Sequence, residues 1–254
     1  MHYQLLPVAE QTIVITGAAS GIGLVTATRA AARGARVVLA ARTDHDLRKA
    51  CDEIRNAAGR AIFVVADVSN PKDVERIADA AVAQFGRIDT WVNNAAVSMA
   101  GPLMDLRLED MRRQMDVSFW GQVYGSREAV SRLRRHGGAL INVASAPDHR
   151  AIPFPGIDRA AEHAVKAFTD TLRMELEAEG VPISVSLVTP ARMDTPFFER
   201  AAADAVLRCA GKPTPEIAPT RGGIGGMRPA ATVAGLVALM VGAVAVANRV
   251  SPFE

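Results

Sequence analysis

The sequence of 254 residues predicts an α/β fold in which a doubly wound parallel sheet lies between two layers of helices. Short apolar runs alternate with longer segments whose apolar residues recur at helical spacing. The runs are nearly continuous in apolar residues, which is typical of parallel strands covered on both faces. A glycine-rich turn joins the first run to the first helix. We therefore expect six parallel strands in the order 3-2-1-4-5-6, with a ligand crevice between strands 1 and 4, where the order reverses.

The expected elements follow one another without a break. The first strand is TIVITG (12–17), a β-branched run that ends in glycine. Further strands are expected at residues 35–42, 60–67, 88–95, 138–145 and 181–190. Helices are expected between them, at residues 21–34 and 44–59 and around 71–85, 105–134 and 157–179. No internal repeat and no linker precedes residue 190, so residues 1–217 are expected to form a single domain.

Composition excludes several classes of function. The formal net charge of +2 is too small to indicate binding to nucleic acid or to an anionic membrane surface. Cys51 and Cys209 provide neither a disulfide framework nor metal-ligand spacing, so no metal site is expected. Two cysteines and a start without a basic and apolar leader favour a cytoplasmic location.

The stretch TGAASGIG indicates a dinucleotide site. It places Gly17, Gly21 and Gly23, with Ser20 and Ile22 between them, at the junction of a strand and a helix. Glycines at this junction permit a tight turn and a close approach of the backbone to a ligand. The helix N-terminus then offers free N–H groups and a positive dipole end to a pyrophosphate. The turn therefore predicts a Rossmann-like cofactor site.

The end of the second strand indicates which dinucleotide is bound. An acid at this position binds the ribose 2′-hydroxyl of NAD(H), whereas an arginine suits the 2′-phosphate of NADP(H). The strand closes on AAR, so Arg42 is the candidate phosphate ligand, and no acid precedes Asp44. A guanidinium binds phosphate in a bidentate manner. NADP(H) is therefore favoured over NAD(H).

Taken together, these motifs resemble those of the short-chain dehydrogenase/reductase family over about residues 9 to 217. The motifs are TGxxxGIG (16–23), DV (67–68), NNAA (93–96, where the family usually has NNAG) and P-x-x-x-x-T (190–195). The resemblance implies that Asp67 and Val68 lie beside the adenine and Asn94 near the cofactor ribose, and that Met193 and Thr195 meet the nicotinamide carboxamide. It also implies a small-molecule substrate and a homo-oligomer formed through the helices at 105–134 and 157–179.

The family's catalytic positions are largely altered in this chain. Ser145 in NVAS matches the family's serine. Counting on from it, the positions of the family's tyrosine and lysine hold Asp158 and Glu162, and the expected asparagine in DVSFWG is Ser118. A carboxyl at 158 is several ångströms shorter than a tyrosine, and with a reference pKa of about 3.9 it would be ionised at neutral pH. Glu162 replaces a positive charge with a negative one.

The two acids also allow a purely structural interpretation. Acids in the first turn of a helix are stabilised by its dipole. Asp158 is placed where it could cap the helix, and Glu162 could pair with Lys166 four residues later.

Three functions therefore remain open. The first is an NADP(H)-dependent oxidoreductase acting on a substrate that needs little proton donation, such as an iminium or a conjugated carbonyl. The second is a cofactor-binding homologue without catalysis. The third is a non-redox isomerase, dehydratase or cyclase that uses Asp158 and Glu162 as acid and base.

The C-terminal segment, residues 218–254, diverges from the family. Residues 229–248 carry no charge over a length that matches a membrane span, but they consist mostly of alanine and valine. A buried helix or strand is therefore favoured, and a membrane span stays open as the alternative.

Overall fold

The computed structural model describes residues 4–144, 155–190 and 196–217. Two units are distinguished along the chain, Met1–Pro219 and Thr220–Glu254, and every described element belongs to the first. The divergent segment 218–254 with its uncharged run, Ser145, Met193 and Thr195 all lie outside the described residues.

The described part of the chain forms one parallel sheet in the order β3-β2-β1-β4-β5-β6-β7, so the predicted order of the first six strands is confirmed. The strands are β1 (Thr12–Thr16), β2 (Arg36–Ala41), β3 (Arg60–Val65), β4 (Thr90–Asn93), β5 (Gly138–Val143), β6 (Ile183–Val188) and β7 (Glu216–Ile217). The sequence did not predict β7. A strand of two residues is too short for hydrophobic periodicity to indicate it.

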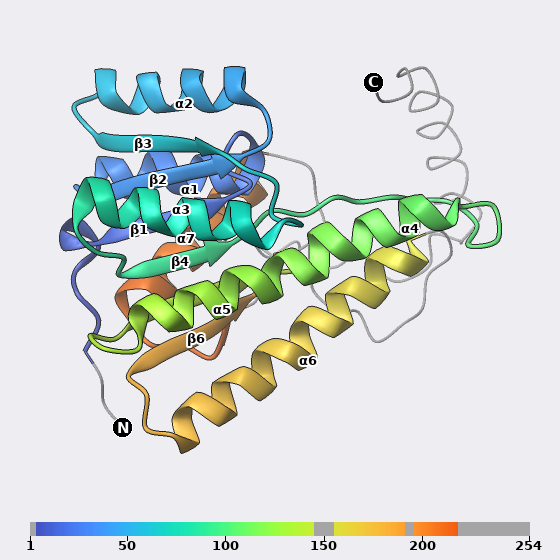
Figure 1. Ribbon diagram of the computed structural model, residues 1–254. Helices are drawn as coiled ribbons and strands as arrows, with labels where there is room; N and C mark the ends of the chain where they lie inside the picture. Colours follow the sequence, from blue (N-terminus) through green and yellow to red (C-terminus); the bar gives the residue numbers. More distant parts are fainter. Residues whose placement is uncertain (1–3, 145–154, 191–195, 218–254) are drawn as a thin grey trace, which may run out of the picture. The chain divides into compact units, whose positions relative to one another are not determined.

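Helices cover both faces of the sheet (Figure 1). One face carries α1 (Gly21–Ala32), α2 (Asp44–Asn56) and α7 (Pro196–Gly211). The other carries α3 (Pro71–Phe85), α5 (Gly121–Leu133) and α6 (Gly156–Ala178). The expected helix at 105–134 is divided into α4 (Leu108–Met115), one π-helical turn η2 (Asp116–Trp120) and α5, and a short 3-10 turn, η1 (Val8–Glu10), precedes β1. The sequence did not predict α7.

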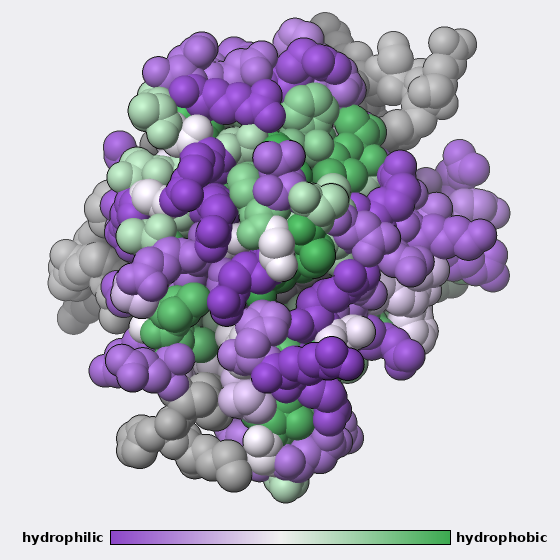
Figure 2. Space-filling view, turned by 60° about the vertical axis from the view of Figure 1, so that its left-hand side comes forward, coloured by the Kyte–Doolittle hydropathy of each residue, from purple (hydrophilic) through white to green (hydrophobic). Residues whose placement is uncertain are grey.

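The three layers follow from the burial of β1. All five of its residues are buried, with Ile13 and Ile15 packed in the core under α1 and α7, and Val14 in the core under α3 and α5. Successive side chains of a strand point to opposite faces, so a strand that is apolar throughout needs helices on both sides. Outside this core, hydrophilic residues cover most of the face shown in Figure 2, with apolar residues in smaller areas between them.

The topology places a crevice at the carboxyl ends of the strands. β1 pairs with β2 on one side and with β4 on the other, so the connections leave β1 and β4 toward opposite faces of the sheet. Ligands of such sheets bind where the connections diverge. Within the described residues, no helix combines the length and the apolar character that a membrane span requires.

Candidate functional site

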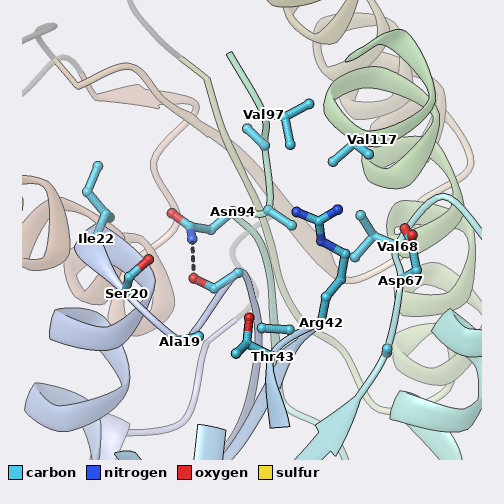
Figure 3. Close-up of a pocket in the computed structure, with 15 residues that line it drawn as sticks. Ala19, Ser20, Ile22, Arg42, Thr43, Asp67, Val68, Asn94, Val97 and Val117 are labelled. Carbon is cyan, nitrogen blue, oxygen red and sulfur yellow. Dashed lines mark hydrogen bonds between the residues drawn. The ribbon is translucent and has the colours of Figure 1, made fainter. Parts of the chain in front are cut away.

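A cavity of about 360 Å³ lies at this divergence, at the carboxyl ends of β1 to β4 (Figure 3). Seven residues predicted from the sequence line it: Gly17, Ser20, Ile22, Arg42, Asp67, Val68 and Asn94. Its other lining residues were not predicted, and most are small or apolar: Ala19, Ala41, Thr43, Ala66, Ala95, Ala96, Val97 and Val117. The cavity therefore brings together residues from five segments of the chain, four of them at strand ends and the fifth, Val117, in η2.

The glycine turn forms one wall of the cavity. Gly17 has a φ of +66° and Gly21 a φ of +54°, a conformation that favours glycine. Gly23 has a different role, because a Cβ atom there would lie 2.3 Å from the Gly17 carbonyl oxygen and 2.6 Å from Asn94 Nδ2. Gly21 and Gly23 do not line the cavity; the missing side chain of Gly23 lets α1 begin close against the residues that follow β1 and β4.

Asn94 holds the glycine turn in place. Its Nδ2 group donates to the carbonyl oxygens of Thr16, at 3.0 Å, and Gly17, at 3.2 Å, and the second of these bonds is drawn in Figure 3. The Thr16 hydroxyl accepts in turn from the backbone N–H groups of Asn94 and Ala95. The amide group of Asn94 is therefore committed to the turn, while the residue still lines the cavity.

Arg42 presents a cation to the cavity. It follows β2, is exposed, and turns its guanidinium into the cavity toward Asn94 and Val68 (Figure 3). In the part of the chain that the structure describes, no hydrogen bond or ion pair holds this guanidinium. Thr43, the N-terminal capping position of α2, lies beside it, and its side chain makes no capping hydrogen bond. The amino end of α2 and a free guanidinium together suit an anionic group.

Asp67 is occupied by protein contacts. Its carboxylate accepts from the backbone N–H and hydroxyl of Ser69, and from Arg113 of α4. Burial raises the pKa of Asp67, but the hydrogen bonds from Ser69 and Arg113 outweigh burial and hold the pKa below its ordinary value. The side chain of Asp67 thus orders the loop after β3, and Val68 supplies the apolar surface next to it.

The acids at 158 and 162 both lie on the buried face of α6. Asp158 is 6% exposed and Glu162 is 8% exposed. Asp158 Oδ1 accepts from Gln114 Nε2 at 2.7 Å, and Glu162 Oε2 pairs with Arg159 Nη1 at 3.1 Å. Neither acid lines the cavity described above. Gln114, which is completely buried, was not predicted from the sequence. Glutamine in an amphipathic helix is usually exposed, so nothing in the sequence marked it.

Two structural expectations for these acids were wrong. Asp158 is not the helix cap, because α6 begins at Gly156 with Pro155 at the capping position, so Asp158 stands in the first turn. Lys166 does not pair with Glu162; it pairs with Asp170 at 3.1 Å and with Glu216 of β7 at 3.2 Å. The strand β7, which the sequence did not indicate, supplies that second partner.

Ser118 lies within the π-helical turn η2 and is buried. Its hydroxyl donates to the Val97 carbonyl at 3.0 Å and accepts from the Val97 N–H at 3.1 Å. Ser118 therefore attaches η2 to the segment that leaves β4. Of the predicted residues at the nicotinamide end, Ser145, Met193 and Thr195 lie outside the described residues, although β5 ends two positions before Ser145.

Comparison with known proteins gives one consistent result. The family model described as short chain dehydrogenase matches residues 11–205. An uncharacterized oxidoreductase of Bacillus subtilis, YxnA, is 50% identical over 200 residues, which is 78% of this chain and 56% of that protein. The 11-beta-hydroxysteroid dehydrogenase A of Sesamum indicum is 37% identical over 72% of this chain and 52% of that protein. The 3beta-hydroxysteroid dehydrogenase 1 of Eggerthella lenta is also 37% identical, over 79% of this chain and 77% of that protein.

A solved structure agrees with these matches. A short chain dehydrogenase from Mycobacterium smegmatis superposes with a TM-score of 0.77 at 25% identity, covering 88% of this chain and 97% of that one. The chain spans about half the length of the Bacillus and sesame proteins that it matches. From the fold, the glycine turn and the match over residues 11–205, the chain belongs to the short-chain dehydrogenase family.

Proposed function

We propose that this chain is an NADP(H)-binding oxidoreductase whose carbonyl reduction is weak or restricted to unusual substrates. Family membership implies a nicotinamide dinucleotide, and the similar proteins include an oxidoreductase and hydroxysteroid dehydrogenases. The proposal rests on a cavity lined by predicted cofactor residues, together with buried acids, Asp158 and Glu162, at the positions that the family resemblance assigns to a tyrosine and a lysine.

The residues at the cavity fit a dinucleotide. Gly17 and the amino end of α1 offer backbone N–H groups to a pyrophosphate, and Val68 offers an apolar surface to a base. Arg42 and Thr43 stand where the 2′-position of the adenosine ribose is bound, and β2 ends without an acid there. A bound nicotinamide cofactor would supply or accept hydride; the chain's own residues orient it and exclude water.

The altered catalytic positions support the second half of the proposal. Asp158 is hydrogen bonded to Gln114 and Glu162 is paired with Arg159, so both carboxyls are held by neighbouring side chains. A carboxyl at 158 is shorter than a tyrosine and is bonded to Gln114, so it does not reproduce the phenol that gives its proton to a developing alkoxide. Glu162 also lacks the positive charge that would stabilise an ionised proton donor. Substrates that need little proton donation, such as an iminium or a conjugated carbonyl, are therefore favoured.

Cofactor choice is tested with Arg42→Ala. We expect the parent chain to bind NADPH more tightly than NADH, measured by titration of the cofactor fluorescence. A charge-assisted hydrogen bond contributes about 1.5 kcal/mol or more, so Arg42→Ala should weaken NADPH binding about tenfold or more and leave NADH nearly unchanged. Arg48→Ala is the matched control, because Arg48 is an exposed arginine of α2 that pairs with Asp44 and does not line the cavity. Equal affinity of the parent chain for both cofactors would remove the argument from Arg42.

Catalysis is tested on a panel of ketones, imines and conjugated carbonyls, with steroid ketones included because of the relatives' names. We expect NADPH consumption with ketones to be near the background rate. Ready reduction of ordinary ketones that is unchanged by Asp158→Asn would contradict the proposal. NADPH binding without turnover of any of these classes of compound would favour the cofactor-binding homologue without catalysis. A cofactor-independent conversion lost in Asp158→Asn would favour the non-redox alternative.

A further inference from the structure

Gln114 is the most completely buried polar side chain next to the altered catalytic positions. It lies on α4, it is 0% exposed, and its Nε2 group donates to Asp158 Oδ1 at 2.7 Å. Its Oε1 atom is buried and accepts no hydrogen bond from the residues that the structure describes. A buried amide oxygen without a partner costs stability, so such a residue calls for an explanation other than general packing.

The contact shows which way Asp158 points. A hydrogen bond from α4 means that the Asp158 side chain extends across the α4–α6 interface and ends at Gln114. The opposite amide orientation would make Asp158 the donor and leave both hydrogens of the Gln114 amide buried without acceptors. Asp158 and Gln114 are therefore matched in length and in hydrogen-bonding character.

The same contact limits what position 158 can hold. Asp158 and Gln114 are both buried, and the cavity described for this end of the sheet is not lined by either of them. A tyrosine is several ångströms longer than an aspartate, and helical side chains have two common χ1 directions. In the direction that Asp158 takes, a phenol ring would overlap Gln114, and overpacking of a filled interior is destabilising.

We propose that Gln114 is a positioning residue that sets the occupant of position 158. It holds the Asp158 carboxyl against α4 and fills the space that a longer, proton-donating side chain would need. Positions 114 and 158 then act as a unit. This inference rests on the proposed function for the meaning of positions 158 and 162. It follows that Asp158→Tyr with Glu162→Lys is not sufficient to restore the family's arrangement, and that Gln114 must also be shortened.

The test is a thermodynamic cycle with a matched control. Gln114→Ala is made in the parent chain and in the Asp158→Tyr/Glu162→Lys background, and the melting temperature of each protein is measured. We expect Gln114→Ala to lower the melting temperature of the parent, and to raise that of the doubly substituted chain by roughly 5 °C. The control is Gln122→Ala, because Gln122 is also a buried glutamine whose Oε1 has no partner among the described residues, and its Nε2 donates to the Val143 carbonyl instead. Gln122→Ala should lower both melting temperatures alike.

A second measurement separates positioning from packing. The absorbance of the introduced phenol is titrated, and a free tyrosine ionises near pH 10. With Gln114→Ala present, the phenol should ionise at least one pH unit lower, because it reaches the introduced ammonium group. With Gln114 intact it should not. Ketone reduction should appear only in the triply substituted chain.

Equal effects of Gln114→Ala in the two backgrounds would overturn the inference. If the doubly substituted chain does not fold, the same cycle is run with Asp158→Glu, which lengthens the side chain by one methylene toward Gln114. NADPH binding is measured in every variant. A chain that binds no NADPH refutes the proposed function, whereas the melting-temperature cycle still decides the role of Gln114.

Discussion

Gly23→Ala tests the close approach of the glycine turn to β4. Two effects of this substitution have opposite signs. Gly23 lies in the first turn of α1, where replacing glycine by alanine ordinarily stabilises a helix by about 0.5–1 kcal/mol. The new Cβ, however, would lie 2.3 Å from the Gly17 carbonyl oxygen and 2.6 Å from Asn94 Nδ2, and both distances are far inside van der Waals contact.

The steric effect should prevail. Overpacking of this kind costs about 1–3 kcal/mol. Displacing Asn94 would break its two hydrogen bonds to Thr16 and Gly17, each of which contributes about 0.5–1.5 kcal/mol to the free energy of unfolding. After the helical gain is subtracted, the net loss is about 3 kcal/mol, which lowers the melting temperature of a domain of this size by roughly 6–12 °C. Because the same bonds shape the turn, NADPH affinity should fall with stability.

The assay is thermal unfolding followed by circular dichroism, together with cofactor titration on the folded protein. Thr28→Ala serves as the control, because Thr28 is exposed on the same helix and its hydroxyl bonds only to the Leu24 carbonyl. It should change the melting temperature little and leave NADPH binding intact. A Gly23→Ala protein that is as stable as the parent and binds NADPH equally well would refute the reasoning.

Three further outcomes are expected. Arg113→Met should lower the free energy of unfolding at neutral pH, and this loss should shrink below pH 3.8. The reason is that the lowered pKa of Asp67 contributes stability that is present above its ordinary value of 3.8 and is lost as the pH falls through the folded-state pKa. A loss that stays constant in urea titrations across pH 3–7 would contradict this. Burial raises the pKa of the Cys51 and Cys209 thiols above their ordinary value of 9.0. Neither thiol should therefore react with a thiol reagent at pH 8 until guanidinium unfolds the chain, and fast labelling of the folded chain would contradict this prediction. Light scattering should detect a homo-oligomer of the parent chain, and Trp120→Lys should weaken it. Trp120 is 45% exposed and lies in the helical segment through which the family resemblance implies association. A monomeric parent chain would refute this.

The structure also explains the division of the long helix at 105–134. The π-helical turn η2 lies between Gln114 and Gln122, and Ser118 lies within it. These three side chains bond to Asp158 on α6, to Val97 after β4 and to Val143 at the end of β5, so one helical segment contacts three different parts of the fold. π-helical turns inside α-helices are frequent at functional sites. A single extra residue rotates the later side chains by about 100° around the helix axis, but no glycine or proline marks it within residues 108–120, and the sequence therefore predicted one continuous helix.

Two errors of prediction concern contacts between segments that are distant in the sequence. The helix α7 was missed although it buries Val206, Leu207 and Ala210 against the sheet and α1. Alanine-rich segments have weak hydrophobic periodicity, so their packing is decided by how closely the backbones approach. The ion partner of Lys166 was assigned within α6, whereas the structure gives it Glu216 of β7 as well as Asp170. Local spacing predicts neighbours on one helix but not those that a later strand brings.

The sequence by itself determined the fold class, the strand order of β1 to β6, the glycine turn and the cation at Arg42. These features depend on local periodicity and on residues a few positions apart, which elementary stereochemistry links directly to strands, turns and helix ends. Only the tertiary structure decided what surrounds Asp158 and Glu162. Gln114 is 44 residues from Asp158 in the chain, and Arg113 is 46 residues from Asp67. Both pairs form because α4 packs beside α6 and above the loop after β3, and the spacing of residues within any one segment carries no record of such contacts.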